Sequence, residues 1–222
     1  MPMIPPPVLA FALAALLPAV ASAMESATEL TVQAQRECEL GRLARERDKR
    51  LAHFVRGQAL AERAVALDER HADAHFALFC SLGEQVRIDG ERITSVFGFR
   101  RVMKELDRTL ELAPNHLDAL SAKGTFLVRL PALFGGNVEK GEDLLRQVIQ
   151  REPRAVNARL SLAKSYCARG RHDEAMTLAL QALELAQAHQ RADFLPEARA
   201  LISQVRAKAG GINSVFNPAR IQ

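Results

Sequence analysis

The sequence predicts an all-α protein, an α-α superhelix of about four helical hairpins followed by a C-terminal capping helix. The 222 residues are 48% hydrophobic and 25% charged, which is enough apolar material to bury the facing sides of stacked hairpins. Ala, Leu and Arg are abundant, and these side chains lose little rotamer freedom in a helix. Long β-branched runs, which would indicate a sheet, are missing. A repeated pattern of helix ends indicates that the helices belong to a repeat array.

This pattern consists of an apolar helix end, a stop and the start of the next helix. It occurs at residues 64–69, 109–114 and 148–153. Five residues beyond each stop stands an alanine that opens a new helix, and these alanines are Ala74, Ala119 and Ala158. A pattern that returns in this way predicts stacked copies of one structural unit.

Small or apolar residues recur where the two helices of each hairpin are expected to cross. Gly141 and Ala175 are 34 residues apart, whereas the earlier intervals, from Gly57 to Val102 and from Val102 to Gly141, are 45 and 39. The same register predicts buried positions one and two turns later, namely Ala61, Leu106, Leu145 and Ala179, then Ala64, Thr109, Val148 and Ala182. The two longer intervals indicate inserted residues.

We expect the insertions within residues 84–101 and near 130–137, between the two helices of a hairpin. Insertions at the same point of successive repeats project from the same face of a solenoid. The sequence therefore predicts a raised rim for partner binding, formed by Phe97, Phe99, Leu133 and Phe134.

The repeat domain is expected to span residues 24–209. Its first hairpin covers about 25–68, with an internal boundary near 48–51. A terminal helix is predicted from Pro196 to Ala209, since proline suits a first helical turn and the following Gly210-Gly211 pair favours a helix end. Residues 210–222 then form a C-terminal tail.

Residues 1–23 are predicted to be a secretory signal peptide. Residues 8–17 form an uncharged apolar run, and Ala21-Ser22-Ala23 is typical of a cleavage site, so the cut is expected between Ala23 and Met24. The run is short for a membrane span, which makes an uncleaved anchor the second choice and leaves no stable span after cleavage. The predicted location is the periplasm or the exterior. No Lys or Arg precedes the run, so a cytosolic protein that starts at Met24 is the alternative.

The unit at residues 157–187 resembles the tetratricopeptide repeat. The resemblance rests on small, aromatic and turn residues that allow two helices to approach closely: Leu162, Ala163, Tyr166, Gly170, Ala175 and Ala182. A second segment, from Leu130-Pro131 through Phe134-Gly135-Gly136-Asn137 to Lys140-Gly141, is similar to one in bacterial proteins of the TRAP transporter T-component type. That resemblance implies a secreted helical protein that assists a substrate-binding protein. T-components are lipoproteins, whereas the residue directly after the predicted cleavage site here is Met24 and not the Cys that a lipid anchor needs.

The first helix of each repeat would line a concave groove. The residues expected there, and predicted to bind a partner, are Phe76, Cys80, Ser121, Thr125, Val128, Leu160, Lys164 and Cys167. A carboxylate-clamp groove would need Asn where this chain has Ala77, Ala122 and Ser161, so an apolar helix or a small apolar ligand fits better. The alternative is that these residues pack against each other or against the terminal helix.

No motif in the sequence indicates catalysis or cofactor binding. Nucleophile, phosphate-binding and dinucleotide motifs are missing. His71 and His75 stand four residues apart, but a metal pair would need further ligands, the residues between them offer only Asp73, and His71 is expected in the turn between repeats. We therefore predict no enzyme activity, catalytic residue, metal or cofactor. The formal net charge is only +4, and the basic residues are interspersed with acidic ones, so nucleic-acid binding is not expected either.

The three cysteines, Cys38, Cys80 and Cys167, do not have zinc-site spacing. Two of them could pair in an oxidising compartment, with Cys38–Cys80 as one pairing, or all three could be small buried hydrophobic residues. The Cα separation that decides between these alternatives cannot be read from the sequence.

Two functions therefore stay open. The first is a periplasmic adaptor or scaffold that binds a protein partner in the groove or on the rim. The second is a transporter-associated carrier of a small apolar ligand, as the T-component resemblance implies. The sequence indicates neither the partner, beyond the substrate-binding protein that the resemblance implies, nor the oligomeric state.

Overall fold

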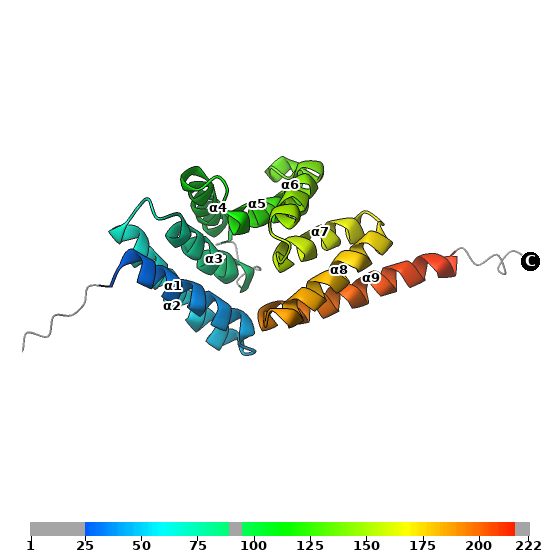
Figure 1. Ribbon diagram of the computed structural model, residues 1–222, viewed down its shortest axis with the longest axis horizontal. Helices are drawn as coiled ribbons and strands as arrows, with labels where there is room; N and C mark the ends of the chain where they lie inside the picture. Colours follow the sequence, from blue (N-terminus) through cyan, green and yellow to red (C-terminus); the bar gives the residue numbers. More distant parts are fainter. Residues whose placement is uncertain (1–24, 89–94, 216–222) are drawn as a thin grey trace, which may run out of the picture.

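The protein is described by a computed structural model that covers residues 25–88 and 95–215, with side chains placed for 25–88 and 98–209. Over these ranges the chain forms nine α-helices, of which the first eight are paired as four antiparallel hairpins (Figure 1). Their bounds are α1 (Ala27–Leu43), α2 (Arg47–Leu67), α3 (Ala72–Ile88), α4 (Ser95–Leu112), α5 (Leu117–Arg129), α6 (Val138–Arg151), α7 (Val156–Ala168), α8 (His172–Ala188) and α9 (Leu195–Val215). The predicted all-α superhelix is confirmed.

The register predicted for the helix crossings is also confirmed. Val102 and Ala175 are buried, and so are Gly57 and Gly141, where the helix backbones approach closely. A Cβ atom on Gly141 would lie 2.9 Å from the carbonyl oxygen of Gly124 on α5, a distance that a side chain cannot occupy. The positions one and two turns later are all at most 1% exposed. Small residues at the crossings therefore set how closely α5 and α6 pack.

The first hairpin turns earlier than expected. Its boundary was predicted near residues 48–51, but α1 ends at Leu43 and α2 begins at Arg47. The charged stretch there contains few apolar residues from which to fix a helix register. The apolar contact that closes the hairpin lies just outside it, where Phe54 covers Gly41 so closely that a Cβ on Gly41 would lie 2.4 Å from the ring.

The predicted insertion at residues 84–101 is largely helical. Helix α3 continues to Ile88 and α4 begins at Ser95, so only residues 89–94 are left as a connection, and these lie outside the described part. The helices are prolonged because their ends carry apolar side chains: Val86 packs against the core, and Phe99 contacts Phe126.

The terminal helix is longer than predicted. Helix α9 runs through Gly210-Gly211 to Val215, so the predicted stop at these glycines is wrong. A glycine inside a helix costs only about 1 kcal/mol, which does not by itself end a helix. Ala198, Leu201 and Val205 of α9 are buried against α7 and α8, so packing supports the helix as far as Val205. The rest of the predicted tail, residues 216–222, lies outside the described part.

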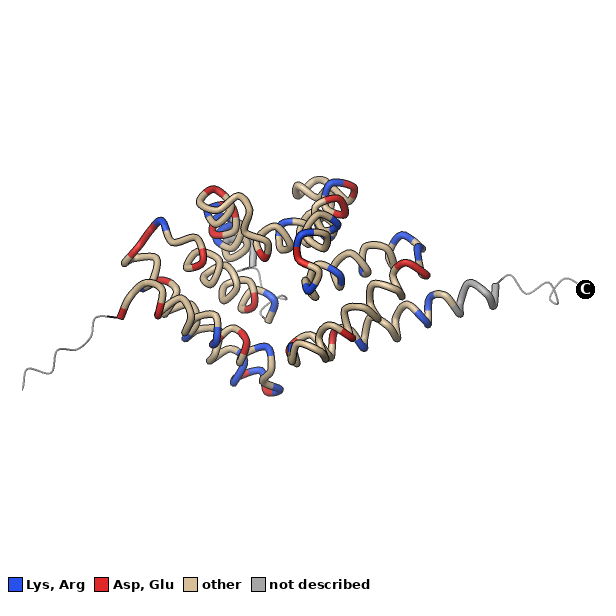
Figure 2. Tube along the Cα trace, in the orientation of Figure 1, with Lys and Arg blue, Asp and Glu red and all other residues tan. Residues whose placement is uncertain are grey.

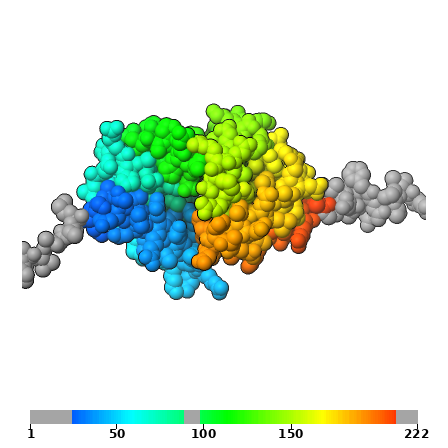
Figure 3. All heavy atoms as spheres, viewed as in Figure 1, coloured from blue at the N-terminus to red at the C-terminus, as the bar shows by residue number. Residues whose placement is uncertain are grey.

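The two ends of the array meet. A 3₁₀ turn, η2 (Ala192–Phe194), connects α8 to α9 and lies against the end of α1 (Figures 1 and 3). There the Arg42 guanidinium stands 3.8 Å from the carboxylate of Asp193, whose side chain is 5% exposed. The first hairpin therefore contacts the terminal cap directly, and the superhelix closes on itself.

Basic and acidic residues are interspersed along the helices (Figure 2). No helix in the described ranges combines the length and the apolar character that a membrane crossing requires.

Candidate interaction surface

The most exposed large apolar side chains in the described part lie between α5 and α6. Here the chain forms a 3₁₀ turn, η1 (Ala132–Phe134). Leu133 is 88% exposed and Phe134 is 68% exposed. We call residues 131–137 the apolar turn. It places two side chains that would normally be buried in contact with solvent.

Backbone hydrogen bonds fix the shape of the apolar turn. The amides of Phe134 and Gly136 both donate to the carbonyl oxygen of Pro131, at 2.9 and 3.1 Å. The Asn137 amide donates to the Leu127 carbonyl at 2.9 Å, which ties the turn back to α5. The Asn137 side chain accepts from the Lys140 amide at 2.9 Å and so caps α6. The turn is therefore a folded part of the array.

Two glycines make this shape accessible. Gly135 has a φ of 85°, in the left-handed region that disfavours residues with a Cβ atom. Gly136 is close to the preceding chain: a Cβ atom here would lie 1.7 Å from the Leu130 carbonyl oxygen. The segment in which the T-component resemblance was noted is thus a turn that requires both glycines.

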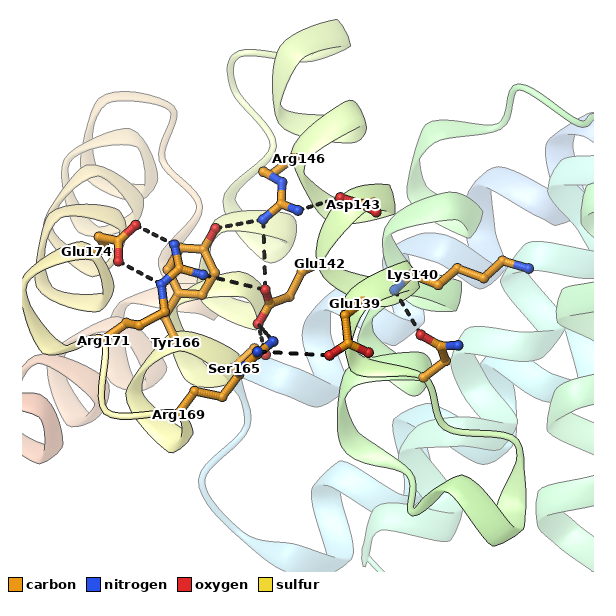
Figure 4. Close-up of polar contacts among 11 residues, drawn as sticks. Glu139, Lys140, Glu142, Asp143, Arg146, Ser165, Tyr166, Arg169, Arg171 and Glu174 are labelled. Atoms are coloured by element: carbon orange, nitrogen blue, oxygen red, sulfur yellow. Dashed lines mark hydrogen bonds and ion pairs between the residues drawn. The ribbon is translucent and has the colours of Figure 1, made fainter.

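The start of α6 is held by a buried carboxylate, Glu142, which is 3% exposed (Figure 4). It accepts a hydrogen bond of 2.7 Å from the hydroxyl of Ser165 on α7. Three guanidinium groups surround it, with shortest N–O distances of 3.8 Å for Arg146, 3.4 Å for Arg169 and 3.6 Å for Arg171. A buried carboxylate needs such compensation, because burial removes its hydration.

A second set of contacts surrounds this carboxylate (Figure 4). Arg146 donates to the Tyr166 hydroxyl at 2.9 Å and also pairs with Asp143. The Arg171 guanidinium lies 3.6 Å from the centre of the Tyr166 ring and pairs with Glu174, which lowers the pKa of that carboxyl group through the hydrogen bond. Together these contacts join α6, α7 and the start of α8, so the helix that follows the apolar turn is held in a fixed position.

The cluster around Glu142 was not predicted from the sequence. The spacing of Glu142 and Arg146 at i and i+4 was a signal, but it is equally typical of an exposed helix face. Only the packing of α6 on α7 shows that the carboxylate is buried.

Three of the four predicted rim residues have described side chains, and these three differ in exposure. Leu133 and Phe134 are exposed as the prediction requires. Phe99 instead lies partly buried on α4, its ring 5.8 Å from that of Phe126. The side chain of Phe97 lies outside the described residues.

The predicted groove residues are engaged with one another and with neighbouring helices. Phe76 is half-buried and stacks on Phe79 at 5.5 Å, and Cys80 lies beside Cys38 of α1. Thr125 donates to Ser161 at 2.7 Å, and Lys164 donates to Glu197 of α9 at 2.5 Å. The others are buried or packed against the core: Ser121 (3% exposed), Leu160 (0%), Cys167 (3%) and Val128.

These contacts correspond to the alternative in which the groove residues pack against each other and the terminal helix. Leu160, Cys167 and Ser121 present no free side-chain surface for a partner. Binding in the groove stays a prediction.

The two histidines that were considered as metal ligands contact other groups of the array. Nδ1 of His75 lies 2.7 Å from the carboxylate of the buried Glu105, and its Nε2 lies 3.1 Å from the Glu69 carbonyl. His71 lies 3.3 Å from the hydroxyl of Thr28. His75 therefore ties α3 to α4.

The described surface includes the following two shallow depressions. One, of about 500 Å³, follows α4 and is lined mostly by charged residues, with Phe99 and Met103 as its apolar residues. The other, of about 360 Å³, lies between α6 and α8 over α7, and its apolar residues are Ile149, Leu162, Tyr166 and Leu178.

The comparisons with known proteins agree with this architecture. Residues 135–193 match the family model of the tetratricopeptide repeat, so the match begins inside the apolar turn and covers α6 to α8. No curated protein matches the sequence.

The chain is also similar to several solved structures. A thermophilic tetratricopeptide repeat protein of Thermus thermophilus shares 19% identity over 83% of this chain and 82% of its own, with a TM-score of 0.57. MamA from Desulfovibrio magneticus RS-1 shares 16% identity over 86% of this chain and 97% of its own, with a TM-score of 0.42. Yeast Tom70 shares 18% identity over 87% of this chain and 42% of its own, with a TM-score of 0.45. The first of these shows that the chain has a tetratricopeptide-like fold.

Proposed function

We propose that this chain is a scaffold that binds a protein partner through the apolar turn. The observation that carries the proposal is the exposure of Leu133 and Phe134 on a turn held by backbone hydrogen bonds. Burying such a side chain in an interface would contribute about 1.5–3 kcal/mol to binding, a stabilisation that the exposed side chains do not provide to the fold. Because the turn is already ordered, a partner would bind it with a small loss of conformational entropy.

The partner should present an apolar pocket. An aromatic side chain inserted into a pocket is a frequent centre of binding energy, and Phe134 is suited to that role. Within this proposal the partner is a substrate-binding protein in the periplasm. The support for it is the signal-peptide pattern of residues 1–23 and the T-component resemblance of residues 130–141.

Alanine substitution of the exposed pair tests the proposed interface. We expect Phe134→Ala, alone and with Leu133→Ala, to weaken binding to a partner purified from periplasmic extract by at least about tenfold, as for a central anchor residue. The matched control is Leu180→Ala on α8, which removes another large apolar side chain that is 46% exposed. Equal affinities for wild type, control and Phe134→Ala would exclude the turn as the interface.

N-terminal sequencing of the mature protein tests the location separately. Export with cleavage should give a chain that begins at Met24 in the periplasmic fraction. Retention of Met1, or a Met24 start confined to the cytosol, would contradict the periplasmic location and leave the interface proposal intact.

One observation favours the second function, a carrier of a small apolar ligand. The depression over α7, at about 360 Å³, is within the size range of ligand sites and has an apolar floor. Native mass spectrometry of the purified protein should then show a bound apolar molecule that Leu178→Trp displaces. A clean unliganded mass argues against this function.

A further inference from the structure

Two cysteines from different hairpins meet inside the array. Cys38 lies on α1 and Cys80 on α3, and their Sγ atoms are 2.9 Å apart. Cys38 is 2% exposed, whereas Cys80 is partly exposed. Helices α1 and α3 pack side by side, so the contact joins the first two hairpins. The third cysteine, Cys167, belongs to a different buried cluster with α7, α8 and α9.

A guanidinium group accompanies this thiol pair. The Arg42 Nη2 atom lies 2.8 Å from the Cys80 sulfur, and its Nε donates to Glu84 at 2.9 Å. A cation at this distance stabilises a thiolate, which is the nucleophilic form of cysteine. The geometry therefore gives the two thiols different roles, with Cys80 beside the cation and nearer to solvent, and Cys38 behind it.

We propose that Cys38 and Cys80 form an exchange-active dithiol, which low-molecular-weight disulfides oxidise to a cross-link between α1 and α3. The sulfurs already lie closer than ordinary non-bonded atoms, and a disulfide bond of about 2.05 Å requires only a small further approach. The link would hold the first hairpin on the second beside the Arg42–Asp193 contact that closes the array.

The reaction consists of two exchange steps. The Cys80 thiolate attacks one sulfur of a disulfide such as glutathione disulfide, the reagent S–S bond breaks, and one glutathione thiolate leaves. Cys38 then gives its proton to solvent and attacks the Cys80 sulfur, and the second glutathione thiolate leaves. Two protein thiols are oxidised, and one reagent disulfide is reduced to two thiols.

The charges that face the pair are consistent with these roles. The pKa of the Cys80 thiol is lowered, first by its hydrogen bond with Cys38 and also by Arg42, against burial and the carboxylates of Glu84 and Asp118. The pKa of Cys38 is raised, chiefly by the same hydrogen bond and by burial. Cys80 is thus the attacking thiol.

Peptide mapping of the wild-type protein tests the cross-link. After equilibration with glutathione disulfide and alkylation, we expect a linked pair of peptides containing Cys38 and Cys80. The oxidised protein should melt roughly 5–10 °C above the reduced one, because the link restricts the unfolded chain. Recovery of both residues as alkylated thiols, or a glutathione adduct on Cys80 that persists, would overturn the proposal.

Single serine variants test the two roles. Cys38→Ser should accumulate a stable glutathione adduct on Cys80, whereas Cys80→Ser should form almost none on Cys38. Cys167→Ser is the matched control and should form the cross-link as the wild type does. Adducts of equal amount in the two variants would overturn the assignment of Cys80 as the attacking thiol, and the mapping of the wild type remains decisive if a variant does not fold.

Discussion

Gly136 is the single residue on which the apolar turn most depends. A Cβ atom here would overlap the Leu130 carbonyl oxygen, so the chain would have to move. We expect Gly136→Ala to destabilise the protein by about 2–3 kcal/mol through overpacking. Gly170→Ala is the comparison, because Gly170 has a φ of 77° but open space around it and should cost only about 1 kcal/mol. Urea unfolding measures both, and equal losses would show that sterics at Gly136 are unimportant.

A second prediction at this scale concerns His75. Its removal leaves the carboxylate of Glu105, which is 9% exposed, without the ring nitrogen at 2.7 Å. We expect His75→Ala to lower the free energy of unfolding by about 2–4 kcal/mol, since a buried charge loses its partner. His71→Ala is the control and should change it by less than about 0.5 kcal/mol, because its contact with Thr28 is exposed. A similar loss for both would contradict a buried His75–Glu105 pair.

Individual residues differ in how far the sequence predicts them. The crossing positions from Gly57 to Ala182 could be predicted because a helix hairpin places the same face inward in every repeat. The environment of Glu142 could not be predicted, because its neighbours Arg169 and Arg171 come from another hairpin. Local spacing does not distinguish a buried carboxylate from an exposed one.

At the scale of elements, helix α6 connects the apolar turn to the rest of the array. We expect Glu142→Ala to cost about 3 kcal/mol, because three guanidinium groups and the Ser165 hydroxyl lose a buried acceptor. The neighbouring Asp143 is 63% exposed, so Asp143→Ala should cost less than about 1 kcal/mol. Hydrogen exchange at the amides of α6 should rise in the first variant alone. Unchanged protection in Glu142→Ala would show that the cluster does not hold the helix.

The order and pairing of the helices could be predicted, whereas several helix ends could not. The α1–α2 turn lies in a charged stretch with few apolar residues to define its register. Helix α9 continues through Gly210-Gly211 because a glycine costs a helix only about 1 kcal/mol, too little to end it. Phe99 looked like part of an inserted loop, but its contact with Phe126 makes it part of α4. Tertiary packing therefore decided the position of Phe99.

At the scale of the whole molecule, the closure of the array changes which surface is available. Each repeat adds a small rotation, and the sum decides whether the ends meet, which no local pattern in the sequence encodes. In this chain η2 reaches α1, and Lys164 in the predicted groove contacts α9. The outward-facing apolar turn, by contrast, stays exposed. The closure therefore favours the turn over the groove as the site for a partner.

Asp193 tests whether this closure holds the array together. Its carboxylate is almost buried between Arg191 and Arg42, at 3.0 and 3.8 Å. We expect Asp193→Ala to separate η2 from α1, which would increase the radius of gyration in small-angle X-ray scattering and cost about 1–3 kcal/mol of stability. Asp173→Ala, at an exposed position in the first turn of α8, is the control and should leave the scattering unchanged. Scattering curves that coincide for wild type and Asp193→Ala would show that helix packing alone fixes the curvature. In that case the contact of Arg42 with Asp193 follows from the curvature and does not cause it.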